Sequence, residues 1–413
     1  MDILRFITAG SVDDGKSTLI GRLLYDSKSI LADQLQAIRR QSRSRVGGEI
    51  DLALLTDGLR AEREQGITID VAYKYFSTSK RKFIVADTPG HIQYTRNMVT
   101  GASTANMAII LIDARHGILE QTTRHAIISS LLRIPHIVVC VNKMDLVDFS
   151  EDRFYEIVRG FQAVAEKLSL KEVYYIPVCA SLGDNIVKRS GNMPWFTGSP
   201  LLPFLEEVPL ASDFNFLLGR FPVQVVIRPQ TPEHPDYRGY AGKIISGVYR
   251  KGDRVKVLPT GWETTIQSLE SSGAAVTESA VPSSIIMHLT DDLDISRGDT
   301  IVPAAQPVTV SQDIRATICW MDTQLIKPGD QFLLQHNCMV VKCVVREIPY
   351  RLDVNSLEHL PVENGVGLND IFTGLIRTAR PLVYDSYADN RANGGFILIN
   401  ENTHLTVGAG MIC

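Results

Sequence analysis

Short apolar runs alternate with amphipathic segments along the first half of the chain. The apolar runs predict buried strands at 3–7, 83–86, 107–112, 137–141 and 173–178. The amphipathic stretches predict helices at 18–24, 121–132 and 153–168. Strands that alternate with helices in this way favour a largely parallel sheet with helices on both faces.

A long polar insertion at residues 25–66 interrupts this alternation. It carries a cluster of arginines, namely Arg39, Arg40, Arg43 and Arg45. A run of charge is commonly the solvated face of a helix. The insertion lies directly before a candidate switch, so a segment that contacts nucleotide or a partner is the alternative interpretation.

The pattern changes after Pro209 to short β-branched runs separated by Gly, Pro and Asp. Strands are predicted at 221–227, 240–248 and 254–258, with turns at 251–253 and 259–261. A second all-β block follows, with a turn at 327–330. Small antiparallel barrels have this pattern. We therefore predict an α/β domain over 1–210 and two β-barrel domains over 219–306 and 308–413.

Composition narrows the class of protein. The 413 residues include 45% hydrophobic and 21% charged side chains, and the net charge is −4. The chain lacks the strong positive charge of a general nucleic-acid binder, so we expect no nucleic-acid partner. We also see no apolar run of membrane-spanning length and no secretory signal. Six cysteines without metal-type spacing are typical of reduced thiols, and we predict a cytoplasmic protein.

A phosphate-binding loop follows the first predicted strand. Gly10 and Gly15 allow successive backbone N–H groups to face phosphate oxygens at the start of a helix. Lys16 is expected to reach the β- and γ-phosphates, and the Ser17 hydroxyl to ligate Mg²⁺. The predicted nucleotide contacts in this loop are Gly10, Ser11, Val12, Asp13, Asp14, Gly15, Lys16, Ser17 and Thr18.

The phosphate loop alone leaves ATPase, kinase and GTPase open, and a second motif follows the strand at 83–86. Asp87 is placed to hold the Mg²⁺ shell through water. The backbone N–H of Gly90 can donate to a γ-phosphate, so the segment after it would sense that phosphate. His91 follows directly in the sequence Asp-Thr-Pro-Gly-His.

The base-reading motif Asn142-Lys143-Met144-Asp145 ends the strand at 137–141. A carboxylate can accept hydrogen bonds from N1–H and the exocyclic amine of guanine, whereas adenine lacks that amine. Asp145 is the candidate for this contact. Asn142 is the candidate for the N7 edge of the base and for bracing the loop, and the Lys143 stem for packing on the base.

A third motif, Gly66-Ile67-Thr68-Ile69, follows the polar insertion. The Thr68 hydroxyl would be a second Mg²⁺ ligand, available only when a γ-phosphate holds the segment in place. The predicted metal ligands are thus Ser17, Thr68 and Asp87, and the predicted cofactors are GTP or GDP with Mg²⁺.

With these motifs in place, the sequence resembles the translational-factor superfamily of GTPases over nearly all of its length. The stretches 10–25, 63–73 and 87–98, and the segments 291–299 and 407–412, are similar to the large GTPase subunits of bacterial heterodimeric sulfate adenylyltransferase, or ATP sulfurylase. Elongation factor Tu is similar in architecture but has His where this chain has Ser11 and Asp14. The resemblance implies a P-loop GTPase domain followed by two β-barrels.

One loop departs from the family pattern. The guanine-closing loop normally reads Ser-Ala-Leu, and Cys179-Ala180-Ser181 occupies that place here. The backbone N–H of Ala180 can still meet guanine O6, whereas the departure calls the supporting hydroxyl contact into question.

The resemblance implies a GTPase whose hydrolysis drives a separate small catalytic subunit in a heterodimer. That subunit would form adenosine 5′-phosphosulfate and pyrophosphate from ATP and sulfate. His91 would position the attacking water, with Lys16 and Thr68 completing the catalytic set. The alternatives are a translation-factor-like GTPase that carries an RNA or acts at a ribosome, and a stand-alone ATPase, which conflicts with the guanine motif.

Overall fold

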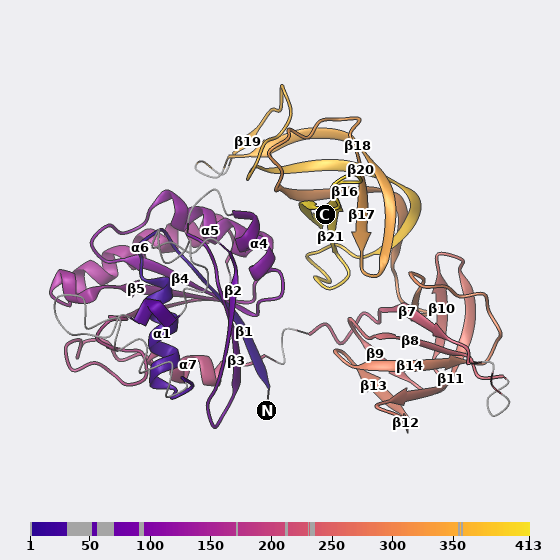
Figure 1. The fold of residues 1–413 in the computed structure, drawn as a ribbon, viewed down its shortest axis with the longest axis horizontal. Helices are drawn as coiled ribbons and strands as arrows, with labels where there is room; N and C mark the ends of the chain where they lie inside the picture. Colours follow the sequence, from indigo (N-terminus) through magenta and orange to yellow (C-terminus); the bar gives the residue numbers. More distant parts are fainter. Residues whose placement is uncertain are drawn as a thin grey trace. The chain divides into compact units, whose positions relative to one another are not determined.

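The protein divides into two compact units after Leu210. The computed structural model describes residues 2–30, 52–55, 70–90, 95–170, 172–210, 214–229, 231, 236–353, 356 and 358–413. The first unit is an α/β domain and the second holds two β-barrels (Figure 1). All six cysteines lie in these ranges and are free thiols.

A six-stranded sheet forms the centre of the first unit, in the order β2-β3-β1-β4-β5-β6. β1 pairs in parallel with β3 and β4, and β5 pairs in parallel with β4 and β6. Every residue of β4 and β5 is buried, as expected for strands covered on both faces. The strands are β1 Ile3–Ala9, β2 Ala72–Ser77, β3 Lys82–Asp87, β4 Met107–Asp113, β5 His136–Asn142 and β6 Val173–Pro177.

β2 was not among the predicted strands. It pairs antiparallel with β3 and forms an edge of the sheet, which makes the sheet mixed. Its residues alternate between exposed and partly buried positions, and only Phe76 is fully buried. The sequence shows no continuous apolar run here because an edge strand of this kind buries little of its surface.

Helices cover the sheet on both sides (Figure 1). α1 and α7 share one apolar core with the strands, which includes Leu19, Leu23, Leu201 and Leu205. Apolar residues at helical spacing explain these contacts. The helices are α1 Lys16–Asp26, α4 Thr95–Ala102, α5 Glu120–Leu131, α6 Glu151–Lys167 and α7 Leu201–Glu207, with 3₁₀ turns η1 Leu52–Leu55 and η3 Met144–Val147.

The first barrel closes through pairing of β10 with β11, in the order β10-β15-β7-β8-β14-β11. β12 extends the sheet beyond β11, and β9 pairs separately with β13. The strands are β7 Phe221–Ile227, β8 Gly239–Lys243, β9 Val248–Arg250, β10 Arg254–Leu258, β11 Trp262–Ser271, β12 Ala274–Val276, β13 Glu278–Ala280, β14 Ser284–Leu289 and β15 Thr300–Pro303.

The second barrel closes through β17 and β18, in the order β17-β21-β22-β16-β20-β18, with β19 added at the end of β18. Closure pairs every strand of the barrel on both sides, so no long edge is left open. The strands are β16 Thr309–Trp320, β17 Gln331–His336, β18 Met339–Leu352, β19 His359–Leu360, β20 Ile371–Tyr384, β21 Gly395–Ile399 and β22 Thr406–Ile412.

The predicted continuous strand at 240–248 was wrong, because the structure divides it into β8 and β9. The residues between them leave the sheet for contacts with other segments. The backbone oxygen of Ser246 accepts a hydrogen bond from the N–H of Arg220, and its hydroxyl accepts one from the Asn390 amide. These partners lie far away in the sequence, so the local pattern could not show the break.

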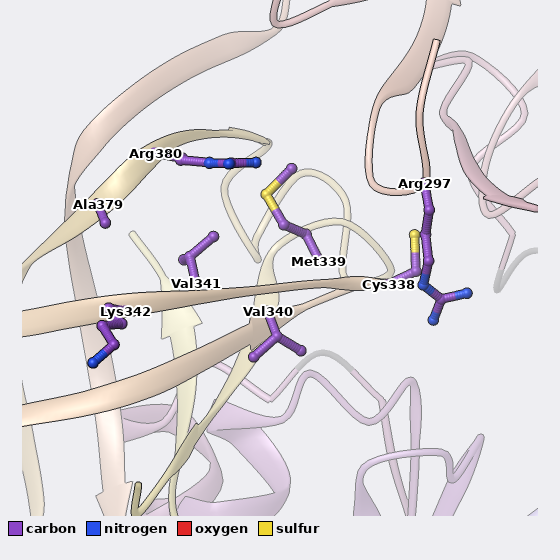
Figure 2. A pocket seen from close by; sticks show the side chains of 8 residues that line it. All are labelled: Arg297, Cys338, Met339, Val340, Val341, Lys342, Ala379 and Arg380. Atoms are coloured by element: carbon purple, nitrogen blue, oxygen red, sulfur yellow. The ribbon is translucent and has the colours of Figure 1, made fainter.

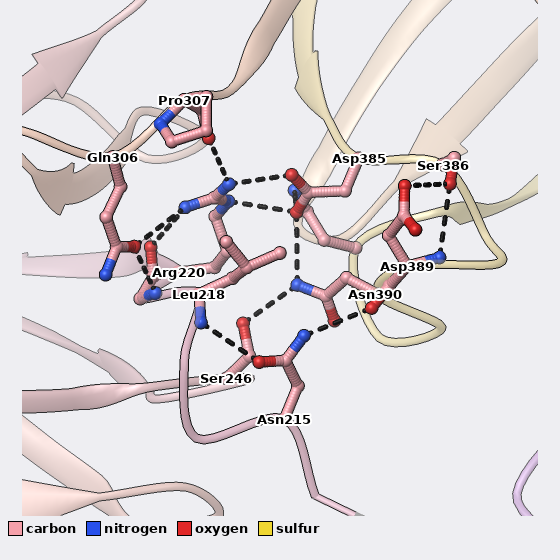
Figure 3. Close-up of polar contacts among 12 residues, drawn as sticks. Asn215, Leu218, Arg220, Ser246, Gln306, Pro307, Asp385, Ser386, Asp389 and Asn390 are labelled. Atoms are coloured by element: carbon pink, nitrogen blue, oxygen red, sulfur yellow. Dashed lines mark hydrogen bonds and ion pairs between the residues drawn. The ribbon is translucent and has the colours of Figure 1, made fainter.

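A buried ion pair joins the two barrels (Figure 3). Arg220, immediately before β7, is fully buried and donates two hydrogen bonds to Asp385, at 2.9 and 2.7 Å. It also donates to the backbone oxygen of Pro307 at 2.7 Å. The amides of Asn390 and Asn393 donate to the same carboxylate. Nearly every polar atom of the pair is therefore satisfied, as burial requires.

We predict that Arg220→Met strongly destabilises the barrel unit. The substitution leaves Asp385 buried without its cation, which should lower the free energy of unfolding by about 3 kcal/mol or more. Urea titration followed by circular dichroism measures the loss. Arg254→Ala is the matched control, since Arg254 pairs with Glu263 at 2.7 Å on the surface and should cost within about 1 kcal/mol. Equal losses in the two variants would contradict the prediction.

Candidate functional site

The phosphate loop lies between the end of β1 and the start of α1. Gly10 and Gly15 have φ values of 145° and 91°, which side chains rarely adopt. A Cβ on Gly10 would lie 2.7 Å from the backbone oxygen of Leu111, and one on Gly15 would lie 2.4 Å from Nδ2 of Asn142. Gly15 supplies no side chain to cap α1, which is the arrangement that binds a phosphate at a helix N-terminus. A side chain at either position would therefore collide with its neighbours, which explains why both residues are glycine.

Lys16 is held inside this loop. Its Nζ donates hydrogen bonds to the backbone oxygens of Gly10 and Ser11, at 3.1 and 2.7 Å. Burial lowers the pKa of the ammonium, and the nearby carboxylates of Asp87 and Asp14 oppose this effect. The cation is therefore placed among the loop carbonyls on the inner side of the predicted phosphate site.

Two of the three predicted metal ligands lie together. The hydroxyl of Ser17 donates to Oδ2 of Asp87 at 3.1 Å, and the hydroxyl of Thr8 donates to Oδ1 at 3.1 Å. Asp87 ends β3 and is buried. A hydroxyl beside a carboxylate is an oxygen donor set of the kind that Mg²⁺ binds. Among the described residues no cluster of three His, Cys, Asp or Glu forms a separate metal site.

The Asp14 side chain bonds back to the start of the phosphate loop. Its Oδ2 accepts a hydrogen bond from the N–H of Ser11 at 2.5 Å. Burial raises the pKa of this carboxyl to about 6, although Lys16 and the Ser11 amide lower it. The neighbouring loop residues Val12 and Asp13 are exposed. Thr18 lies in the first turn of α1.

Asn142 connects the phosphate loop to the guanine-closing loop. Its Nδ2 donates to the backbone oxygen of Asp14 at 2.8 Å, and its Oδ1 accepts from the N–H of Ala180 at 3.0 Å. Asn142 was predicted to brace the loop, and these two bonds are contacts of that kind. The second bond occupies the Ala180 N–H, which was predicted to meet guanine O6.

Lys143 is positioned by Asp113, a residue that lies outside the predicted motifs. Its Nζ lies 2.9 Å from Oδ2 of Asp113, which is buried at the end of β4 and also accepts from the Arg115 guanidinium at 2.7 and 3.1 Å. Burial raises the pKa of Asp113, but the hydrogen bonds from Arg115 and Lys143 outweigh it and hold the pKa below its usual range. No local sequence signal marks Asp113. The strand register of the folded sheet pairs it with Asn142, the first residue of the guanine motif, and so places it beside Lys143.

The departure at Cys179 places a thiol beside the base-reading carboxylate. The Cys179 Sγ donates to Oδ1 of Asp145 at 2.9 Å and lies 3.2 Å from the Ser181 hydroxyl. Burial raises the pKa of the thiol to about 11, and Asp145 adds to the rise. The thiol is therefore protonated at neutral pH and supplies the donor that a serine hydroxyl would otherwise give.

Gly90 lies against the phosphate loop: a Cβ on it would be 2.5 Å from Nζ of Lys16 and 2.8 Å from the oxygen of Gly10. Thr68 and His91, two of the three predicted catalytic residues, lie outside the described residues. The described members of the predicted site thus gather at the ends of β1, β3, β5 and β6, while Thr68 and His91 stay predictions from sequence.

A separate cavity of about 390 Å³ lies in the barrel unit (Figure 2). Its wall combines the cations Arg297, Lys342 and Arg380 with apolar side chains such as Met339 and Val340. None of the predicted nucleotide contacts lines it. The cavity is therefore separate from the candidate nucleotide site at the sheet edge.

Comparison with known families agrees with the fold. The family described as "Elongation factor Tu GTP binding domain" matches residues 1–219, and the family "GTP-eEF1A C-terminal domain-like" matches 313–413. The fold and site therefore define a P-loop GTPase with the elongation factor Tu type of domain. A solved structure of sup35 complexed with GMPPNP aligns with a TM-score of 0.45 and 22% identity, over 100% of this chain and 93% of that one.

Curated relatives identify the family more narrowly. Sulfate adenylyltransferase subunit 1 of Cellvibrio japonicus is 51% identical over 100% of this chain and 86% of its own length. The subunit of the same name from Bacteroides thetaiotaomicron is 48% identical over 100% and 86%. The bifunctional enzyme CysN/CysC of Mycobacterium tuberculosis is 51% identical over 99% of this chain and 67% of its own length. The chain belongs to the sulfate adenylyltransferase subunit 1 family.

We predict that Asp14 makes the stability of the GTPase domain depend on pH. The pKa of Asp14, about 6, exceeds its ordinary value of 3.8, so the folded state favours the protonated carboxyl. This stabilisation is fully present below about pH 4 and is lost as the pH rises to about 6. Asp14→Asn cannot ionise, and should be more stable than the parent at pH 7 by about 2 to 3 kcal/mol.

Denaturant titrations of both proteins between pH 3.5 and 7.5 measure this difference. Asp13→Asn is the control, because Asp13 is exposed on the same loop. The control should follow the parent at every pH. A constant difference between Asp14→Asn and the parent across the range would show that the carboxyl does not titrate as proposed.

Proposed function

We propose that this chain is the GTP-hydrolysing subunit of a sulfate adenylyltransferase. It would couple GTP hydrolysis to formation of adenosine 5′-phosphosulfate and pyrophosphate from ATP and sulfate on a separate small catalytic subunit. The observation that carries the proposal is full-length similarity to relatives named sulfate adenylyltransferase subunit 1, together with a phosphate loop and guanine motif held in one network. The word "subunit" in those names supports a partner chain.

Different residues of the described site would bind different parts of GTP. The amides of the phosphate loop and the Lys16 ammonium would hold the β- and γ-phosphates, which carry the negative charge of the transition state. Asp145, oriented by the Cys179 thiol, would accept from N1–H and the exocyclic amine of guanine. Asn142 would keep the two parts of the site at a fixed separation.

Ser17 and Asp87 would hold Mg²⁺, with Thr68 as a further ligand when the γ-phosphate is present. When bound, Mg²⁺ supplies positive charge to the β- and γ-phosphates. Gly90, which lies beside Lys16, would donate its N–H to the γ-phosphate and report its presence to the following segment. His91 would orient the attacking water.

The direct test measures GTP hydrolysis and adenosine 5′-phosphosulfate formation by the purified chain, with and without a sulfate adenylyltransferase small subunit, in Mg²⁺, ATP and sulfate. We expect the small subunit to stimulate hydrolysis and GTP to increase product formation. GTP binding without any response to that subunit would overturn the coupling role and favour the translation-factor-like alternative, which measured affinity for tRNA or ribosomes would then support.

We predict that His91→Ala lowers GTP turnover in the complex by about 100-fold while the affinity for GTP changes little, because the side chain would act on the attacking water only. Single-turnover hydrolysis and equilibrium binding of a fluorescent GTP analogue separate the two effects. His116→Ala, a change at an exposed histidine of the same domain, serves as the control for loss of a histidine side chain. Unchanged turnover in His91→Ala would remove this residue from the mechanism.

A further inference from the structure

Helix α5 contacts both loops that would surround the γ-phosphate. Gln121 Nε2 donates a hydrogen bond to the backbone oxygen of Gly90 at 3.0 Å. His125 Nδ1 accepts a hydrogen bond from the backbone N–H of Gly10 at 2.9 Å. The two side chains are four positions apart and thus share one face of the helix. α5 therefore holds the first glycine of the phosphate loop and the glycine that follows Asp87.

The contact from His125 requires a neutral imidazole, because Nδ1 must offer a lone pair to the Gly10 amide. His125 is buried, and burial lowers its pKa to about 3, with further lowering by Lys16 and Arg124. The acceptor is therefore present at every pH near neutrality. Gly10 begins the predicted phosphate loop, so this bond positions a part of the site that GDP and GTP would share.

Gln121 contacts the loop that follows β3 and contains Gly90. Gly90 packs directly on the phosphate loop, since a Cβ on it would meet Lys16 Nζ and Gly10 O. Gln121 is partly buried and holds the Gly90 carbonyl from the helix side. Chain movement at Gly90 is thus limited by the phosphate loop on one side and by Gln121 on the other.

We propose that Gln121 and His125 are positioning residues with different roles. Gln121 keeps Gly90 in place for a γ-phosphate and so raises affinity for GTP over GDP, whereas His125 supports binding of both nucleotides equally. This inference rests on the proposed function, in which Gly90 donates to the γ-phosphate. Neither residue touches the nucleotide itself.

The test measures dissociation constants for fluorescent GDP and for a fluorescent, non-hydrolysable GTP analogue with the full chain and Mg²⁺. Gln121→Met has similar length but no donor. It should weaken binding of the GTP analogue about fivefold, as expected for one lost hydrogen bond, and leave GDP binding within about twofold. Glu120→Gln, an exposed change on the same helix, is the matched control and should leave both constants unchanged.

His125→Leu should weaken both nucleotides by the same factor, about fivefold or more, since the Gly10 amide loses its acceptor. His125→Asn places an oxygen near the former position of Nδ1 and should restore most of that loss. Thermal unfolding of each variant shows whether it is folded. A merely structural role for Gln121 would lower the unfolding temperature without moving the ratio of the two constants.

An unchanged GTP-to-GDP ratio in Gln121→Met would overturn the role of Gln121, and failure of His125→Asn to recover binding would overturn that of His125. If the parent chain binds neither guanine nucleotide, the proposed function itself fails. Binding by the parent with no selective effect in the variants leaves the proposed function standing and rejects this inference alone.

Discussion

Parallel pairing of five neighbouring strands is the constraint on which the nucleotide site depends. Because β1, β3, β4, β5 and β6 run in the same direction, their carboxyl ends meet at one edge of the sheet. Those ends carry Asp87, Asp113 and Asn142, which are the last residues of β3, β4 and β5. Gly10 directly follows β1, and the guanine-closing loop at 179–181 follows β6. Side-chain hydrogen bonds then link them, and Asn142 spans the phosphate loop and the guanine-closing loop. A shift of one strand would break these hydrogen bonds, because the groups that they join lie on different strands and loops.

The barrel unit is stabilised in a different way. Its two closed barrels have separate apolar cores, and a buried ion pair with its amide partners lies between them. Desolvating Arg220 and Asp385 is unfavourable, and the dense hydrogen bonding around both groups offsets it. Surface pairs such as Arg254 with Glu263 lack this burial and contribute little. The ion pair therefore constrains how the two barrels pack, because Arg220 and Asp385 are both satisfied only in this arrangement.

The motifs of the candidate site can be recognised in the sequence because its predicted chemistry lies in short stretches. The phosphate loop, Asp87 and the Asn142 to Asp145 motif each follow an apolar run, and the described members come together as that pattern suggests. Other members carry no local signal. Asp113 positions Lys143, and Gln121 and His125 contact Gly90 and Gly10 from a helix. The break between β8 and β9 was missed for the same reason, since distant partners determine it. Edge strand β2 was missed because it buries little of its surface.

The sequence by itself determined the order of domains, the type of nucleotide loop and the family, because these depend on local composition and on long runs of motif residues. Only the tertiary structure decided which polar groups satisfy one another. It shows that the Cys179 thiol replaces a hydroxyl as donor to Asp145, and that Asn142 occupies the Ala180 amide. It also shows that Arg220 meets Asp385 across 165 positions. Such pairings depend on how strands and loops pack in space, which no short stretch of sequence encodes.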